Sequence, residues 1–264
     1  MERPPTRVGI MTYRYVQLCE TLAAYSQTGI SLIAFDGSSY FQPGPSDDSG
    51  MFYYLPHLAR PLGISLDRAI DLFYGGIATI SFTSGLVGLL FLLRSFLARL
   101  LGTIGFLVIF ALCFYKGDIY LIQSSIVITV VPWFLYLVQR KANPATLLFF
   151  AIGVGLCSGV ANNIRAHAGT VVTIFVALIT LLHTGWARWQ KLVLVGSMLL
   201  ALLLPILHFR HLLASRDAYL AAIQPNGTYP PRGRAYWHTI YIGFGFLTNP
   251  YVPAYLDQVA NKKA

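Results

Sequence analysis

Long apolar stretches constrain this sequence more than any other feature. A membrane-spanning helix needs about 20 mostly apolar residues. Six stretches meet this length, at about 70–93, 97–115, 119–138, 145–162, 168–187 and 191–209. Only 11% of the residues are charged, whereas a soluble domain has about 25%. The sequence therefore predicts an all-α, polytopic bundle of transmembrane helices.

A seventh stretch, residues 16–35, is less apolar because it contains Gln17, Glu20 and Gln27. Three interpretations stay open for it: a poor first span, a helix lying at the membrane interface, or the remnant of a truncated N-terminus. The bundle is accordingly expected to have six or seven spans.

Basic residues in the connecting loops predict the orientation of the bundle. Alternate loops collect six Lys and Arg residues on one side and two on the other; the six are Arg94, Arg99, Arg140, Lys141, Arg188 and Lys191, and the two are Lys116 and Arg165. The positive-inside rule assigns the first group to the cytoplasm. We therefore expect a transmembrane bundle over residues 1–209 with an extracytoplasmic loop at 36–69, followed by an extracytoplasmic segment at 210–264.

The net charge is +9, and a basic charge can indicate a nucleic acid partner in a soluble protein. Here we assign the basic residues to the orientation of the bundle in the membrane, and we expect no nucleic acid partner. The predicted location is an integral, multi-pass position in a membrane, the bacterial inner membrane in particular. Membrane lipids are then partners of the whole bundle.

Unusual polar residues gather on the expected outer face. They are the adjacent pair Asp47 and Asp48 with Tyr53 and Tyr54 after it, Asp118, Arg165, His167 and His238. Ionisable residues near a membrane are costly and often mark a substrate path. A carboxylate can take a proton from an acceptor hydroxyl, and an Arg fork can bind the oxygens of a phosphate leaving group. This combination predicts transfer from a lipid-linked phosphate.

Simpler interpretations remain for the same residues. Asp47 and Asp48 can cap a helix that starts near Ser49, Asp118 can cap the next span, and Arg165 with His167 can anchor helix ends at the interface. Tyr53 and Tyr54 suit an interfacial anchor as well. Three glycines lie in one span, Gly153, Gly155 and Gly159, and such glycines indicate close helix packing. A nucleotide-binding loop is excluded, because it requires a preceding strand and none is predicted here.

Three segments together resemble the GT-C fold of polytopic glycosyltransferases, which includes the protein O-mannosyltransferases and bacterial enzymes that use polyprenyl-phosphate sugars. The segments are "DDSGMFYYLPHLARPLGIS", "YKGDIYLIQSSIVITVVPWFLYL" and "ATLLFFAIGVGLCSGVANNIRAHAGT", and the similarity covers roughly residues 30 to 210. Family members usually have 11 or more spans and a large C-terminal half, so the resemblance is to a truncated member.

The resemblance implies inverting transfer of a sugar from a polyprenyl-phosphate donor to an acceptor of unknown identity. It implies that the acid of the first loop is catalytic, either Asp48, which directly precedes the aromatic helix, or Asp47. Substrate binding is expected from Arg165, His167, Asp118, Tyr53, Tyr54 and His238. No cofactor and no set of metal ligands is predicted, although a divalent metal stays open.

Two other functions compete with this one. A non-enzymatic membrane protein, such as a transporter, flippase or assembly subunit, has the same composition. A transporter is expected to show paired broken helices in two halves, and no such repeat is present. An O-antigen ligase or polymerase type of enzyme also acts on lipid-linked glycans and usually carries its main functional loop late in the chain.

Overall fold

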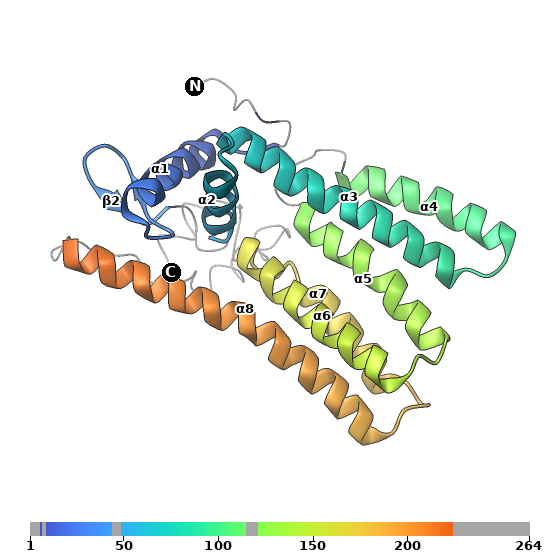
Figure 1. The fold of residues 1–264 in the computed structure, drawn as a ribbon. Coiled ribbons are helices and arrows are strands. Elements are labelled where there is room, and N and C mark those ends of the chain that lie inside the picture. Colours follow the sequence, from blue (N-terminus) through green and yellow to red (C-terminus); the bar gives the residue numbers. More distant parts are fainter. Residues whose placement is uncertain (1–5, 7–8, 44–48, 115–120, 224–264) are drawn as a thin grey trace, which may run out of the picture. The chain divides into compact units, whose positions relative to one another are not determined.

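The computed structural model describes residues 6, 9–43, 49–114 and 121–223. Within these ranges it contains eight helices and one short hairpin, which confirms the all-α class (Figure 1). Five helices are long and apolar enough to cross a membrane: α3 (Leu66–Leu92), α4 (Phe96–Phe114), α5 (Leu121–Gln139), α6 (Pro144–Ile164) and α8 (Arg188–Ile223). The chain is therefore an integral, multi-pass membrane protein.

The stretch at 168–187 forms a shorter helix than the sequence predicts. Helix α7 (Thr170–Leu182) has 13 residues, which gives about 20 Å against a hydrocarbon core of about 30 Å. Gly169 explains its late start, because this residue lies against the backbone of Ser158, well inside α6. The chain after α6 thus turns back along that helix before α7 begins.

The seventh stretch, 16–35, is not a single helix. Helix α1 (Thr12–Thr28) ends at Gly29, which adopts a left-handed φ of 72° and donates its N–H to the Tyr25 carbonyl. Strands β1 (Ala34–Phe35) and β2 (Tyr40–Phe41) then form an antiparallel hairpin. Of the open interpretations, the structure therefore excludes one continuous spanning helix over these residues.

The helix expected to start near Ser49 is present and is amphipathic. Helix α2 (Met51–Leu62) buries Met51, Phe52, Leu55 and Ala59 on one face. The residue at its N-cap is Gly50, which has no side chain with which to cap the helix. The helix is instead fixed by its buried face and by a backbone contact described below.

Helix α8 continues beyond residue 209, where the last span was expected to end. Its 36 residues extend over about 54 Å, which exceeds the thickness of a hydrocarbon core. Leu220 and Arg216 are buried in this added part. The helix therefore carries the chain well past the expected membrane boundary to Ile223.

Two glycines of α6 make the closest helix contact. An added Cβ would lie 2.2 Å from the Met198 carbonyl oxygen at Gly155 and 2.6 Å from that of Leu202 at Gly159. The predicted packing role is confirmed for these two. It is wrong for Gly153, where a Cβ would meet open space. The reason is geometric: residues four apart share a helix face, whereas residues two apart do not.

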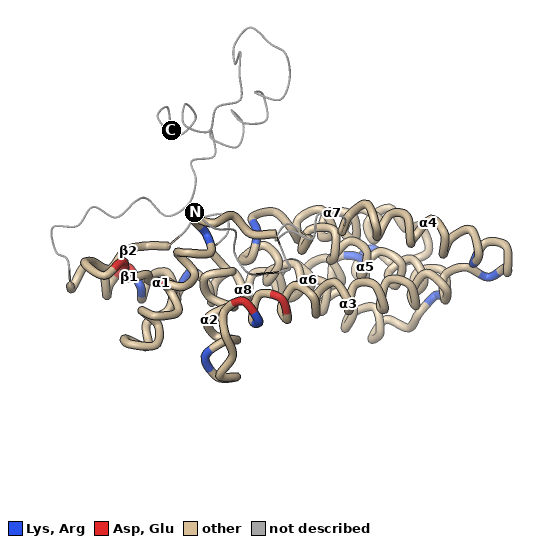
Figure 2. The backbone as a smooth tube through the Cα atoms, turned by 90° about the horizontal axis from the view of Figure 1, so that it is seen from above, with Lys and Arg blue, Asp and Glu red and all other residues tan. Residues whose placement is uncertain are grey.

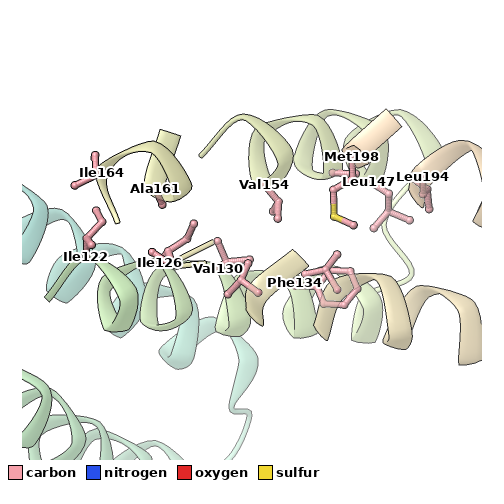
Figure 3. Close-up of a cluster of buried hydrophobic side chains, with 14 residues drawn as sticks. Ile122, Ile126, Val130, Phe134, Leu147, Val154, Ala161, Ile164, Leu194 and Met198 are labelled. Carbon is pink, nitrogen blue, oxygen red and sulfur yellow. The ribbon is translucent and has the colours of Figure 1, made fainter. Parts of the chain in front are cut away.

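Buried side chains form two clusters. The first joins α5, α6, α7 and α8, and in Figure 3 the α5 side chains Ile126, Val130 and Phe134 lie opposite residues of α6 and α8. The second joins α1, α2 and the start of α3 with Phe209 of α8. The second cluster holds the amphipathic helix of the first loop against the end of the bundle.

The described charges are distributed unequally between the two ends of the bundle. The described acids are Glu20, Asp36, Asp67, Asp71 and Asp217, all at the end that carries α1 and α2 (Figure 2). The connections at the other end carry Arg94, Arg140, Lys141 and Arg188. Described basic residues also lie at the end with α1 and α2, among them Arg14, Arg60, Arg68, Arg165 and Arg210. The positive-inside rule counts Lys and Arg rather than Asp and Glu, so the expected orientation stays a prediction.

Candidate functional site

The first loop is attached to the end of α6 by one backbone hydrogen bond. The N–H of Gly50, the residue before α2, donates to the carbonyl oxygen of Asn163 at 2.8 Å. That carbonyl lies in the last turn of α6, where helix geometry leaves C=O groups without a partner. A Cβ on Gly50 would lie 2.4 Å from the same oxygen, so the contact requires glycine.

Two asparagines fasten α6 to its neighbours at this point. The Asn163 side-chain amide donates to the Pro205 carbonyl of α8 at 3.0 Å. The Asn162 side-chain oxygen accepts from the Gly169 N–H at 2.8 Å, just before α7 begins. The end of α6 is therefore the point at which α2, α7 and α8 are all held.

The expected cationic residues lie directly beyond this junction. Arg165 is the C-cap of α6, and its N–H donates to Ala161 at 2.9 Å while its side chain is half-buried. His167 is exposed and has a left-handed φ of 67°. Both follow the negative end of the α6 dipole, which favours cations. The structure thus brings Arg165 and His167 next to the start of α2.

Tyr53 and Tyr54 of α2 contact two different helices. The Tyr54 ring stacks on Phe73 of α3 at 6.3 Å, whereas Tyr53 meets Phe209 of α8 edge-on at 6.0 Å. Burial raises the pKa of the Tyr54 phenol, and a hydrogen bond with Asn163 acts in the opposite direction. Both tyrosines therefore hold α2 in place beside the α6 junction.

Four of the predicted site residues lie outside the described residues. These are Asp47, Asp48, Asp118 and His238. Their predicted roles stay predictions. In the sequence, Asp48 is separated from Gly50 only by Ser49, and Asp118 lies between Phe114 and Leu121.

A cavity of about 780 Å³ opens at the same end of the bundle, among α3, α4 and α5. Its polar edge includes Asp67, Arg68 and Asp71, and its apolar part includes Phe110 and Phe114. Asp67 accepts a hydrogen bond from the Tyr15 hydroxyl. Burial, and after it this hydrogen bond, raises the pKa of the Tyr15 phenol. The cavity therefore combines charged side chains from the start of α3 with aromatic side chains from the end of α4.

Sequence reasoning did not single out Asp67 and Asp71. The signal was present, because two carboxylates four residues apart share one helix face at the beginning of an apolar span. Phe114 and Leu121 also line this cavity, and they are the ends of the connection that contains Asp118. Of the described acids, Asp67 and Asp71 thus line this cavity.

In the part of the chain that the structure describes, no group of three or more His, Cys, Asp or Glu side chains is arranged to hold a metal ion. The described residues at this end of the bundle form two groups. Arg165 and His167 follow the end of α6, and carboxylates and aromatic rings line the cavity among α3, α4 and α5. Such a set can bind a phosphate and hydrogen-bond hydroxyl groups.

The fold and this site define the class of the protein as a multi-pass membrane protein with a polar site at one end of its bundle. Comparison of the chain with family models, curated proteins and solved structures gave no match.

Proposed function

We propose that this chain is a membrane glycosyltransferase, or a part of one, that transfers a sugar from a polyprenyl-phosphate donor to an acceptor on the extracytoplasmic face. The observation that carries the proposal is the hydrogen bond between Gly50 and Asn163. It joins the loop that bears the paired acids to the helix end that bears Arg165.

The chain itself limits how far the acids lie from this junction. Consecutive Cα atoms are about 3.8 Å apart, so the Cα of Asp48 lies within about 7.6 Å of that of Gly50. Arg165 follows Asn163 by two residues. A carboxylate and a guanidinium therefore belong to the same end of the bundle, as transfer from a phosphate donor requires.

The proposed reaction is a direct displacement at the anomeric carbon. A carboxylate of the pair Asp47 and Asp48 removes the proton of the acceptor hydroxyl, whose oxygen bonds to the anomeric carbon from the face opposite the phosphate. The bond between that carbon and the phosphate oxygen breaks, and the electron pair leaves with the polyprenyl phosphate. Arg165 stabilises the charge that develops there through bidentate hydrogen bonds. The configuration at the anomeric carbon is inverted.

The cavity among α3, α4 and α5 suits a substrate of mixed polarity. Phe110 and Phe114 offer an apolar wall for a prenyl chain, and the carboxylates of Asp67 and Asp71 can accept hydrogen bonds from sugar hydroxyls. This chemistry supports a lipid-linked sugar as the ligand over a purely apolar lipid.

Binding of the donor tests the proposal. The purified full chain in nanodiscs is photo-crosslinked to a polyprenyl-phosphate sugar that carries a diazirine in its lipid chain. We expect crosslinking to fall at least tenfold in Arg165→Ala and to recover only in part in Arg165→Lys, because an ammonium does not bind phosphate bidentately. Arg94→Ala, at the opposite end of the bundle, is the matched control. Equal crosslinking of the parent and Arg165→Ala would reduce Arg165 to an anchor.

A further inference from the structure

A second cavity lies at the opposite end of the bundle from the site described above. It has a volume of about 480 Å³ and is lined by the connection between α5 and α6 and by the start of α8. Its polar and aromatic lining includes Lys141, His183, Trp186, Trp189 and Gln190. The positive-inside rule places this end of the bundle at the cytoplasmic surface of the membrane.

One wall of this cavity is fixed by a tight turn. Lys141 follows α5 with a left-handed φ of 51°, and the Ala142 N–H donates to Leu137 at 3.0 Å. Asn143 then caps α6 by accepting from the Thr146 N–H at 2.8 Å. The backbone that carries the Lys141 side chain is therefore fixed by hydrogen bonds on both sides of this residue.

The other wall is fixed by side chains that follow α7. The His183 ring stacks on Trp186 with 4.3 Å between ring centroids, and it also accepts from the Gly185 N–H at 3.1 Å. Lys191 donates to the Leu181 carbonyl at 2.8 Å. The aromatic rings and the cations are thus positioned by contacts within the chain.

The charge around this cavity is of one sign. The connection between α5 and α6 carries Arg140 and Lys141, and the first turn of α8 carries Arg188 and Lys191. Residues 119–216 contain no Asp or Glu. The described acids lie at the opposite end of the bundle (Figure 2). A ligand that complements this cavity is therefore an anion.

The apolar part of the lining continues onto the lipid-facing surface. Leu148, Val193 and Leu194 line the cavity, and their neighbours Phe149 and Leu192 are 74% and 68% exposed. Trp189, which also lines it, is 63% exposed. Tryptophan is favoured at the level of the lipid headgroups. The lining thus offers a cation for the headgroup of a phospholipid, two tryptophans for its glycerol region and an apolar surface for its acyl chains.

We propose that this cavity binds an anionic phospholipid of the cytoplasmic leaflet. The lipid phosphate pairs with Lys141, the glycerol region lies against Trp186 and Trp189, and the acyl chains follow Leu148 and Val193. Basic pockets between transmembrane helices on the cytoplasmic side are suited to such headgroups. The proposal is independent of the glycosyl transfer proposed above.

Tryptophan fluorescence in nanodiscs tests this site. The full chain is placed in phosphatidylcholine nanodiscs that contain increasing fractions of acyl-brominated phosphatidylglycerol or, in a parallel series, acyl-brominated phosphatidylcholine. We expect half-maximal quenching at an about fivefold lower fraction of the anionic lipid. Trp186→Phe combined with Trp189→Phe should remove this preference and so identify the reporting residues.

Charge variants decide whether the cavity is responsible. Lys141→Gln removes the charge without easing or worsening the left-handed backbone, and it should abolish most of the preference. Arg94→Gln, in another loop at the same end, is the matched control and should retain it. Equal quenching by both lipids, or an unchanged preference in Lys141→Gln, would refute the site. Loss of the preference on adding millimolar glycerol 3-phosphate would also overturn it, because the ligand would then be a soluble anion.

Discussion

The N–H of Gly50 is hydrogen-bonded to the carbonyl oxygen of Asn163, across 113 residues of sequence, at 2.8 Å. The contact pairs two groups that helix ends otherwise leave without partners, one before α2 and one in the last turn of α6. Any side chain on residue 50 would meet the backbone of α6. This contact sets the distance between the first loop and the cationic end of α6.

Gly50→Ala should separate these two elements. The added Cβ would approach backbone atoms of Asn163 and Ile164 to within 2.4–2.7 Å, and neither can move without shifting α6. Overpacking of this kind costs about 1–3 kcal/mol of the free energy of unfolding. We expect a lower Tm and a loss of donor crosslinking.

Gly76→Ala is the control for this variant, because an added Cβ there meets open space within α3 and Gly76 does not line the proposed donor cavity. It should leave both the Tm and donor crosslinking unchanged or raise the Tm. If Gly50→Ala behaves like Gly76→Ala, the junction has no part in forming the site.

His167 allows its backbone and its imidazole to be tested separately. Its φ of 67° lies in the left-handed region, which costs a non-glycine residue roughly 1–2 kcal/mol. His167→Gly should therefore keep or raise the Tm while removing the ring. If the imidazole binds the donor, crosslinking falls in His167→Gly although the fold is retained; unchanged crosslinking would leave His167 with a turn-forming role alone.

Two glycines of α6 should respond in opposite ways to the same substitution. Gly155→Ala places a Cβ 2.2 Å from the Met198 carbonyl oxygen and should lower the Tm by separating α6 from α8. Gly153→Ala meets open space and should stabilise the helix by about 0.5–1 kcal/mol. Thermal unfolding in detergent measures both, and equal Tm shifts would contradict the packing of α6 on α8.

The local patterns in the sequence predicted most of the spans, but not the contacts between them. Helices α3, α4, α5 and α6 follow the apolar stretches closely, because burial of an apolar helix in lipid depends on composition and length alone. The short α7 was not predictable from composition, since its start is set by the contact of Gly169 with Ser158. The end of the last apolar stretch did not end α8, because Leu, Ala and Arg after residue 209 still favour a helix.

The candidate site was predictable only in part. Arg165, His167, Tyr53 and Tyr54 stand out as polar or interfacial residues at the ends of apolar runs, and the structure brings the start of α2 to the end of α6. The contact between these two helix ends is the hydrogen bond from the Gly50 N–H to the Asn163 carbonyl oxygen. Both groups belong to the backbone, so the residue types in the sequence do not indicate the contact. Asp67 and Asp71 were overlooked although their spacing places them on one face.

The orientation of the bundle can be checked with single cysteines. The three native cysteines, Cys19, Cys113 and Cys157, are first replaced by serine. A cysteine at position 47 should then react with an impermeant maleimide added to intact cells, whereas one at position 140 should react only after permeabilisation. The reverse pattern would place the acids in the cytoplasm and remove the basis of the proposed function.

The central claim is that the paired acids of the first loop catalyse sugar transfer. The most direct measurement is release of polyprenyl phosphate from a radiolabelled polyprenyl-phosphate sugar in membranes that contain the full chain together with their native acceptors. A general base contributes about 10²–10⁴-fold to rate, so Asp→Asn at the catalytic position, which we expect to be residue 48 rather than 47, should reduce release by at least a hundredfold at unchanged expression. The same change at the other position should retain substantial release. Release at the parent rate from the double variant Asp47→Asn with Asp48→Asn would contradict the account.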